Sequence, residues 1–298
     1  MQKIAIVFSL LILLATTALA QTPPTLRIVT EDPKLPSQLF YGDVQVKPLR
    51  LRPGTNVVIT IDDSDFFVQQ HYIDFLSRFP EQAGFQTWLN VLNSCNNDAN
   101  CLYGPNGKRI LVSQSFFGSQ EFNLKGGYVF RFYRASFGQA FAQLPKYTDM
   151  VTAMQSVTGA TGDEVNQKRT AFATNWVLRS DFLAAYPRSL TPTQFVDNIS
   201  ATAGITLSNR SQIISDLTAA GNSDAGRAVA MRAIVDSQEE QNKEFNSSFV
   251  FMQYIGYLRR DPEQAGFNSW LDYLTTHPGD FNTMVWGFVD SAEYRNRF

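Results

Sequence analysis

The sequence contains few of the side chains from which metal and redox sites are usually built. Its 298 residues include two cysteines, Cys95 and Cys101, and two histidines, His71 and His277. Their spacing matches no zinc-binding pattern, and the cysteines do not form the Cys-x-x-Cys pair of redox-active thiols. We therefore predict neither a metal ion nor another cofactor.

Charge of either sign is also scarce. Charged residues make up 17% of the chain, and the formal net charge is −2. No cluster of lysines and arginines appears, so the sequence lacks the basic stripe typical of nucleic-acid binding and the field that attracts anionic membranes. The P-loop, the dinucleotide fingerprint, the His-Glu-x-x-His motif and the Gly-x-Ser-x-Gly elbow are all missing.

Long hydrophobic runs are missing except at the N-terminus, which has the pattern of a secretory signal. Lys3 is followed by the apolar run Ile4–Leu14 and by the small residues Ala18–Ala20, with cleavage expected before Gln21. An uncleaved anchor is the alternative, but the run is short for a span of about 20 residues. No cysteine follows it directly, which argues against a lipid anchor. We predict an exported, soluble mature chain, extracellular or associated with the cell envelope.

The two cysteines are predicted to pair. In an exported chain, a disulfide between Cys95 and Cys101 closes a short polar loop. Such a short loop contributes about 2 kcal/mol in the chain-entropy description.

The most informative feature present is an internal duplication. Phe67–Asn93 recurs as Phe249–Thr275 at a constant offset of 182, with 15 of 27 positions identical. A closing element, Phe116–Phe122, recurs as Phe288–Tyr294 at an offset of 172, so the earlier unit carries ten extra residues that include the cysteine loop. We call residues 67–122 the first copy and residues 249–294 the second copy. What both copies share is expected to serve folding.

The pattern predicts a mainly α chain: a degenerate helical-repeat domain at 63–298, with weaker echoes between the copies, after a short β-rich segment at 21–62. The echoes, Trp176–Phe182 and Ile234–Glu239, resemble the closing element, which suggests about four units. In the β-rich segment we predict strands within Leu26–Thr30, Val44–Leu51 and Asn56–Ile61, and a turn at Arg52–Thr55.

Each copy is predicted to contain an apolar helix followed by a second helix. An apolar stripe is expected on the first helix, with Asp63, Ser64 or Asp65 capping its start. In the second copy Asp261 is expected to cap the next helix, with Pro262 and Glu263 in its first turn; Phe79 replaces that aspartate in the first copy. The predicted stripe comprises Phe67, Val68, Tyr72, Phe75 and Leu76.

Candidates for catalytic residues are few, and each has a structural alternative. His71 is either a general base or a polar residue on the helix flank, and His277 lies in a predicted loop. The duplicated carboxylates are either acids or groups that support helix starts. We favour the structural interpretation for all of them. The duplicated carboxylates are Glu81 and Glu263, and Glu121 and Glu293.

Two further features could bind ligands. The acidic run Asp62–Asp65 could hold calcium, although its spacing fits no calcium loop and a helix cap is the simpler interpretation. Tryptophans could stack on carbohydrate, but Trp88 and Trp270 lie in the apolar stripe and are expected in the core. Trp286 lies outside the shared pattern and is the better candidate for a surface aromatic.

The duplicated motif resembles a domain-of-unknown-function family of bacterial exported and cell-surface proteins, whose members read Leu-x-Arg-x-Pro-Asp-x-x-Gly-x-x-x-Trp. It is also distantly similar to the helical domain of phycobilisome linkers. The resemblance implies a helical module without established enzymatic activity, and it supplies no catalytic residues. The positions that carry it are Arg78, Pro80, Gly84 and Trp88 in the first copy, and Arg260, Pro262, Gly266 and Trp270 in the second.

These observations favour a secreted or cell-envelope structural or interaction module without catalytic activity, whose partners are protein or glycan components of the envelope. An extracellular hydrolase that uses the carboxylates and a glycan-binding module are the alternatives. No nucleic-acid partner is expected.

Overall fold

The computed structural model describes residues 26–29, 38–41, 44–46, 50–51 and 57–298, and it is mainly α-helical, as predicted. The predicted signal segment at 1–20 and the predicted turn at Arg52–Thr55 lie outside the described residues. Within the described part of the chain, no helix is both long and apolar enough to cross a membrane.

The strands are short and antiparallel. β1 (Leu26–Val29), β2 (Gln38–Tyr41) and β3 (Val44–Val46) follow one another in a three-stranded sheet, and β4 (Arg50–Leu51) pairs with β5 (Val58–Ile59). The sequence did not predict β2, and the run predicted at 44–51 is divided between two strands that belong to different sheets.

The helices form three successive groups. The first copy contains α1 (Ser64–Leu76), α2 (Gln82–Asn93), α3 (Ala99–Leu102), α4 (Lys108–Phe117) and α5 (Gln120–Phe122). The middle of the chain contains η1 (Asn123–Gly127), α6 (Tyr128–Phe137), η2 (Phe141–Gln143), α7 (Tyr147–Ser156), α8 (Gly162–Trp176), α9 (Ser180–Ala185), α10 (Pro192–Ala203), α11 (Arg210–Ala219) and α12 (Asp224–Val235). The last group contains α13 (Gln238–Gln253), η3 (Tyr254–Leu258), α14 (Gln264–Thr276), α15 (Phe281–Val289) and α16 (Ala292–Arg295).

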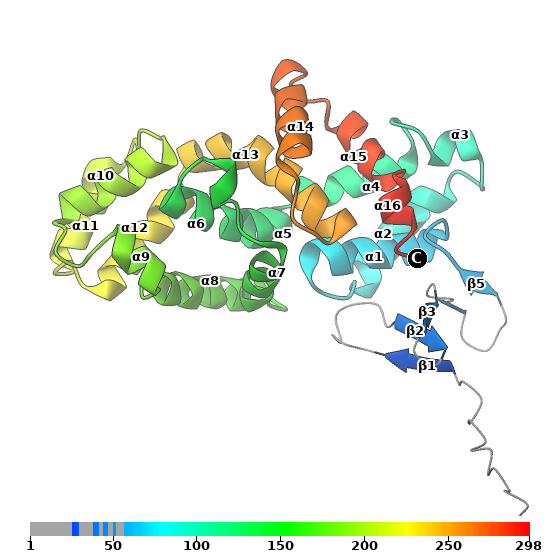
Figure 1. The fold of residues 1–298 in the computed structure, drawn as a ribbon, viewed down its shortest axis with the longest axis horizontal. Coiled ribbons are helices and arrows are strands. Elements are labelled where there is room, and N and C mark those ends of the chain that lie inside the picture. Colours follow the sequence, from blue (N-terminus) through cyan, green and yellow to red (C-terminus); the bar gives the residue numbers. More distant parts are fainter. Residues whose placement is uncertain (1–25, 30–37, 42–43, 47–49, 52–56) are drawn as a thin grey trace, which may run out of the picture.

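Figure 1 shows these helices as an elongated body. On the left, α6 packs against α10 and α12, and α12 also packs against α8 and α11. On the right, the first copy and the helices that end the second copy lie together, and α13 extends from the left group towards them. The start and the end of the helical chain are therefore neighbours.

The predicted apolar stripe of α1 is buried; its five members are at most 4% exposed. Asp63 is the N-cap residue by position, but its side chain makes no cap bond and instead accepts a hydrogen bond from the Thr60 amide at 2.7 Å. Ser77 ends α1 in the left-handed conformation, and its counterpart Arg259 ends η3 in the same way.

The expected start of the second helix in the second copy was wrong. α14 begins at Gln264, and its N-cap is Glu263 rather than Asp261, so Pro262 precedes the helix instead of opening it. Asp261 binds a different helix: its Oδ1 accepts a hydrogen bond from the amide of Tyr147, the first residue of α7, at 2.6 Å. A carboxylate at that position satisfies one of the free amides of a helix N-terminus.

In both predicted closing elements, a serine at the same position caps the start of a helix. Ser119 and Ser291 each accept a hydrogen bond from the amide three residues later, at 3.1 Å in both copies. Ser237, in one of the weaker echoes, does the same at 3.2 Å, whereas the other echo has Arg179 as its N-cap. In each of these three elements the serine therefore caps the helix that begins at the next residue.

The two copies pack directly against each other. The rings of Phe75 and Tyr257, which occupy equivalent positions at the offset of 182, lie 4.8 Å apart, and Phe117 lies 4.8 Å from Phe249. A Cβ atom at Gly256 would lie 1.9 Å from the Phe75 ring, so this close approach requires glycine.

A buried ion-pair cluster completes the contact between the copies. Asp74, whose side chain is 2% exposed, pairs with Arg259 at 2.7 Å and with Arg297 at 3.1 Å. These two arginines hold the pKa of Asp74 below its usual value although burial acts in the opposite direction. In the insertion of the first copy, Cys95 and Cys101 form the predicted disulfide.

Candidate functional site

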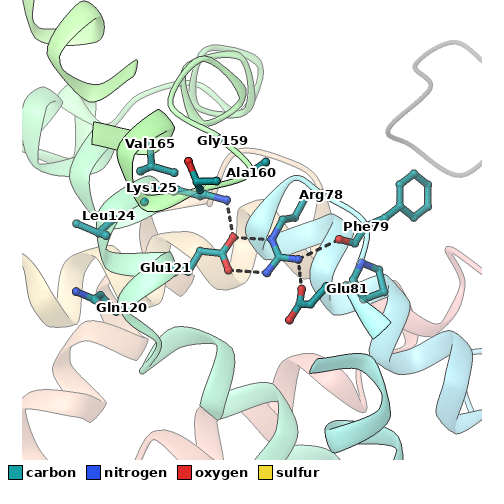
Figure 2. A pocket seen from close by; sticks show the side chains of 13 residues that line it. Arg78, Phe79, Glu81, Gln120, Glu121, Leu124, Lys125, Gly159, Ala160 and Val165 are labelled. Atoms are coloured by element: carbon teal, nitrogen blue, oxygen red, sulfur yellow. Dashed lines mark hydrogen bonds and ion pairs between the residues drawn. The ribbon is translucent and has the colours of Figure 1, made fainter. Parts of the chain in front are cut away.

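The motif arginine of the first copy lies between two carboxylates. Arg78 donates from Nε and Nη2 to the two oxygens of Glu121, both at 2.7 Å, in a bidentate ion pair (Figure 2). Its Nη1 donates to the Phe79 carbonyl at 3.0 Å and to Glu81. Hydrogen bonds to Glu121 and Glu81 raise the pKa of Arg78, so this network is charge-assisted throughout.

The second copy repeats this network atom for atom. Arg260 donates from Nε and Nη2 to Glu293 at 2.6 and 3.1 Å, and from Nη1 to the Asp261 carbonyl at 3.1 Å and to Glu263 at 2.5 Å. The duplicated carboxylates thus hold the loop before the second helix against the closing element. The ion pairs and hydrogen bonds that both copies make therefore stabilise the fold.

The motif glycines leave room for this network. A Cβ atom at Gly84 would lie 2.2 Å from a Glu81 oxygen and 2.3 Å from the Tyr72 hydroxyl. The corresponding distances at Gly266 are 2.2 Å to Glu263 and 2.4 Å to Tyr254. The absence of a side chain at each glycine therefore lets a tyrosine and the ion-paired glutamate approach the helix.

The motif tryptophans pack on the core, as predicted. Trp88 lies 6.0 Å from the ring of Phe116, and Trp270 lies 6.0 Å from the equivalent Phe288. Both are partly buried, whereas Trp286 is 39% exposed and is the surface aromatic that the sequence suggested.

A hollow of about 550 Å³ opens beside Arg78 in the first copy. We call it the Arg78 hollow. It lies between the loop at 77–81 that joins α1 to α2, η1 and the loop before α8. Figure 2 shows the Lys125 side chain reaching Glu121 beside Gly159 and Ala160. The Arg78 hollow is larger than the hollows beside α11 and α12, about 270 Å³, and between α7 and α8, about 440 Å³. Its lining comprises Arg78, Phe79, Pro80, Glu81, Gln120, Glu121, Leu124, Lys125, Gly159, Ala160, Thr161, Gly162 and Val165.

Lys125, in η1 directly after the first copy, supplies a second cation beside Glu121. Its Nζ lies 2.5 Å from Glu121, and its side chain is 1% exposed. Burial lowers the pKa of Lys125, while the ion pairs with Arg78 and Lys125 lower the pKa of Glu121 against the opposing effect of burial. The carboxylate therefore stays ionised and is a poor general acid near neutral pH.

Phe79 distinguishes the first copy from the second. Its side chain is 61% exposed at the mouth of the hollow, whereas the equivalent Asp261 binds the start of α7 and also pairs with Lys146 at 3.2 Å. The structure thus explains Asp261 by an internal contact, and it leaves the large apolar ring of Phe79 in solvent.

The histidines do not form a catalytic site with the duplicated carboxylates. His71 was expected on the helix flank, but it is fully buried. It hydrogen-bonds the Phe67 carbonyl at 2.8 Å, Ser113 at 2.7 Å and Tyr257 at 3.2 Å, and burial lowers its pKa to about 4. His277 ends α14 and stacks on Tyr273 at 4.4 Å, so it has a partner that the sequence did not suggest.

The acidic run Asp62–Asp65 is divided among separate contacts. Asp62 pairs with Arg295 at 2.5 Å and accepts a hydrogen bond from Tyr103 at 3.1 Å. Asp65 accepts a hydrogen bond from the Phe66 amide at 2.8 Å. In the described part of the chain, no three acidic, histidine or cysteine side chains are grouped so that they could hold a metal ion.

A pair of buried carboxylates escaped the sequence analysis. Glu240 and Glu244 lie one turn apart on α13 and are at most 1% exposed. Glu244 pairs with Arg134 at 3.2 Å, but neither oxygen of Glu240 has a hydrogen-bond partner among the described residues. Burial and the nearby Glu244 raise the pKa of Glu240 to about 8. The spacing indicated one helix face, but nothing in the sequence indicated that this face is covered.

Comparison with known proteins gives one match. A family described as a domain of unknown function, DUF4214, matches residues 230–298, which include the second copy. No curated protein and no solved structure matches the chain.

Proposed function

We propose that this protein is an exported, non-catalytic binding module of the cell envelope, and that the Arg78 hollow with Phe79 at its mouth is the contact site. The observation that carries the proposal is the contrast between the copies. Their polar motif residues make the same internal bonds, whereas Phe79 makes the first copy different and lies exposed beside a hollow. An exposed ring at a concave surface favours binding.

The carboxylates support binding better than hydrolysis. An acid–base pair needs one carboxyl group with a raised pKa, and ion pairs lower the pKa of both Glu121 and Asp62 against the effect of burial. Glu240 has a raised pKa, but it is completely buried and lines none of the hollows described above. These observations favour a module without catalytic activity over the hydrolase alternative.

Export is supported by the N-terminal sequence pattern and by the disulfide. Disulfides persist in oxidising compartments, and the pair Cys95–Cys101 is formed in the insertion that only the first copy carries. The signal-like pattern of Lys3, Ile4–Leu14 and Ala18–Ala20 points to the same compartment.

Site-specific photocrosslinking in the cells that produce the protein tests the proposal. Replacing Phe79 by p-benzoylphenylalanine keeps an aromatic side chain at the mouth of the hollow, and the same replacement at the exposed Trp286 is the matched control. We expect a discrete adduct in the envelope fraction from position 79 and none from position 286. A protein recovered free in the medium, without adducts from position 79, would contradict the proposal.

A further inference from the structure

We infer that the hollow beside α11 and α12 binds a small planar aromatic molecule of about the size of an indole ring. We call it the α11/α12 hollow; the two helices lie on the left in Figure 1. Its volume of about 270 Å³ is just below the range of sites for drug-sized ligands, which fits a ligand of one or two fused rings. This site lies apart from Phe79, so the inference goes beyond the proposed function and does not depend on it.

The helices around this hollow correspond to helices of the second copy. The segment Asp236–Glu239 recurs as Asp290–Glu293 at an offset of 54, and both contain the serine that caps the next helix. Without a gap, the same offset places α11 on α14 and α12 on α15. It also pairs Ile213 with Phe267, and both of these side chains are 4% exposed. The two pairs of helices can therefore be compared position by position.

The second copy holds its motif tryptophan at the place that corresponds to the hollow. The Trp270 ring lies on α15, because a Cβ atom at Gly287 would lie 3.2 Å from it and the Phe288 ring lies 6.0 Å away. At the offset of 54, Trp270 corresponds to Asp216, which lines the α11/α12 hollow. Gly287 corresponds to Ala233, which lines it as well. The hollow is therefore open where the second copy contains an indole ring.

Two further differences enlarge this space. Leu274 and Met284 of the second copy are at most 1% exposed. The corresponding residues, Ala220 and Ala230, have much shorter side chains and line the hollow. A space left by truncating large apolar side chains can bind an aromatic molecule that restores the lost contacts. The second copy thus indicates the shape of the missing group, which is a planar ring.

The mouth of the hollow combines an apolar side chain with one carboxylate. Val229, which lines the hollow, is 63% exposed, more than any other large hydrophobic residue in the described part of the chain. A ring that covers it removes apolar surface from water. Asp216 is the charged group among the described lining residues, and its Oδ1 accepts a hydrogen bond from Gln212 at 2.7 Å. An acceptor at this place favours a ring that carries an N–H donor over a ring that carries a carboxylate.

Isothermal titration calorimetry on the purified full chain tests the inference. Indole is the probe, cyclohexanol is an apolar molecule without a planar ring, and indole-3-acetate is an anionic analogue. We expect indole to bind, and both other molecules to bind about tenfold more weakly or not at all.

Two variants at one position separate the shape of the hollow from its charge. Asp216→Trp introduces the residue of the second copy and fills the hollow, so it should abolish indole binding and raise the unfolding temperature. Asp216→Asn is the matched control, because it removes the charge without filling the space. It should bind indole as the wild type does and bind indole-3-acetate more tightly than the wild type. If circular dichroism shows that Asp216→Trp is unfolded, Ala220→Leu, which copies Leu274, takes its place.

Several results would overturn the inference. These are no binding of indole, binding of cyclohexanol or indole-3-acetate as tight as that of indole, or wild-type affinity for indole in a folded Asp216→Trp or Ala220→Leu. Binding of the peptide Gly-Trp-Gly without binding of indole would assign the hollow to a protein side chain and would equally overturn it. Photocrosslinking from position 79 tests the proposed function separately, because Phe79 lines a different hollow.

Discussion

At the scale of single residues, the motif glycines are determined by the side chains above them. Gly84 and Gly266 lie on the first turns of α2 and α14, where helix propensity alone would favour alanine. The glutamate and tyrosine that cover each glycine leave no room for a methyl group. The sequence shows that glycine is duplicated, whereas the reason lies in the glutamate that precedes each helix and in a tyrosine contributed by a neighbouring helix.

Substituting these glycines should destabilise both copies. We expect Gly84→Ala and Gly266→Ala each to lower the free energy of unfolding by about 1–3 kcal/mol, because the new methyl group displaces the ion-paired glutamate. Gly162→Ala is the control, since a Cβ atom there meets nothing within 4 Å. Urea denaturation measures all three, and equal stability of the three variants would contradict this role.

His71 should make the fold sensitive to acid. Its folded-state pKa of about 4 lies below the ordinary value of 6.5, so protonation favours the unfolded chain. The stability that the neutral imidazole contributes is present above pH 6.5 and is lost as the pH falls through 4, by up to about 3 kcal/mol.

Replacing His71 by the residue at the equivalent position of the second copy tests whether His71 makes the fold sensitive to acid. His71→Gln, which copies Gln253, should reduce the loss of unfolding free energy between pH 6.5 and pH 4 relative to the wild type. Urea denaturation across that range gives the slope for each protein. Parallel slopes would show that His71 does not titrate with folding.

At the scale of elements, sequence periodicity predicted which faces are buried but not which helix contacts which. The apolar stripe of α1 and the recurrence of the closing element that contains Ser119 and Ser291 could be read from local pattern, because stripes and caps depend on neighbours in the sequence. Asp261 was assigned to the wrong helix, because its partner Tyr147 is 114 residues away. The Arg78 hollow was missed for the same reason, since the loop before α8 forms one of its walls.

The contact between α13 and α6 contains the buried carboxyl group of Glu240, which the sequence did not indicate. The pKa of Glu240, about 8, lies above its ordinary value of 4.5 because of burial and Glu244, while Arg131, Arg134 and Lys243 oppose the shift. The protonated form is favoured in the fold. Stability from this group is therefore full below pH 4.5 and is lost as the pH rises through 8.

Replacing the Glu240 carboxyl group by an amide should stabilise the protein at pH 8. We expect Glu240→Gln to raise the free energy of unfolding at pH 8 by roughly 3 kcal/mol and to change it little at pH 4.5. Asp272→Asn changes an exposed carboxylate on α14 and should alter neither value. Urea denaturation at the two pH values decides, and an equal effect of Glu240→Gln at both would refute the assignment.

At the scale of the whole molecule, the first and second copies pack against each other, so the two ends of the helical chain are neighbours. The rings of Phe75 and Tyr257 and the Asp74 ion pairs join the copies, so the duplicated motifs belong to one packed unit. Within that unit one difference between the copies bears on binding: the first copy has Phe79 where the second copy has Asp261. We assign binding to that difference and stability to what the copies share.

The most direct test is retention of the purified protein by envelopes from the cells that produce it. Wild type and Phe79→Asp, which introduces the residue of the second copy, are compared in one sedimentation assay, with thermal unfolding measured in parallel. We predict that the wild type sediments with the envelopes, that Phe79→Asp stays in solution, and that the two unfold at the same temperature. Equal retention of the two folded proteins would contradict the account.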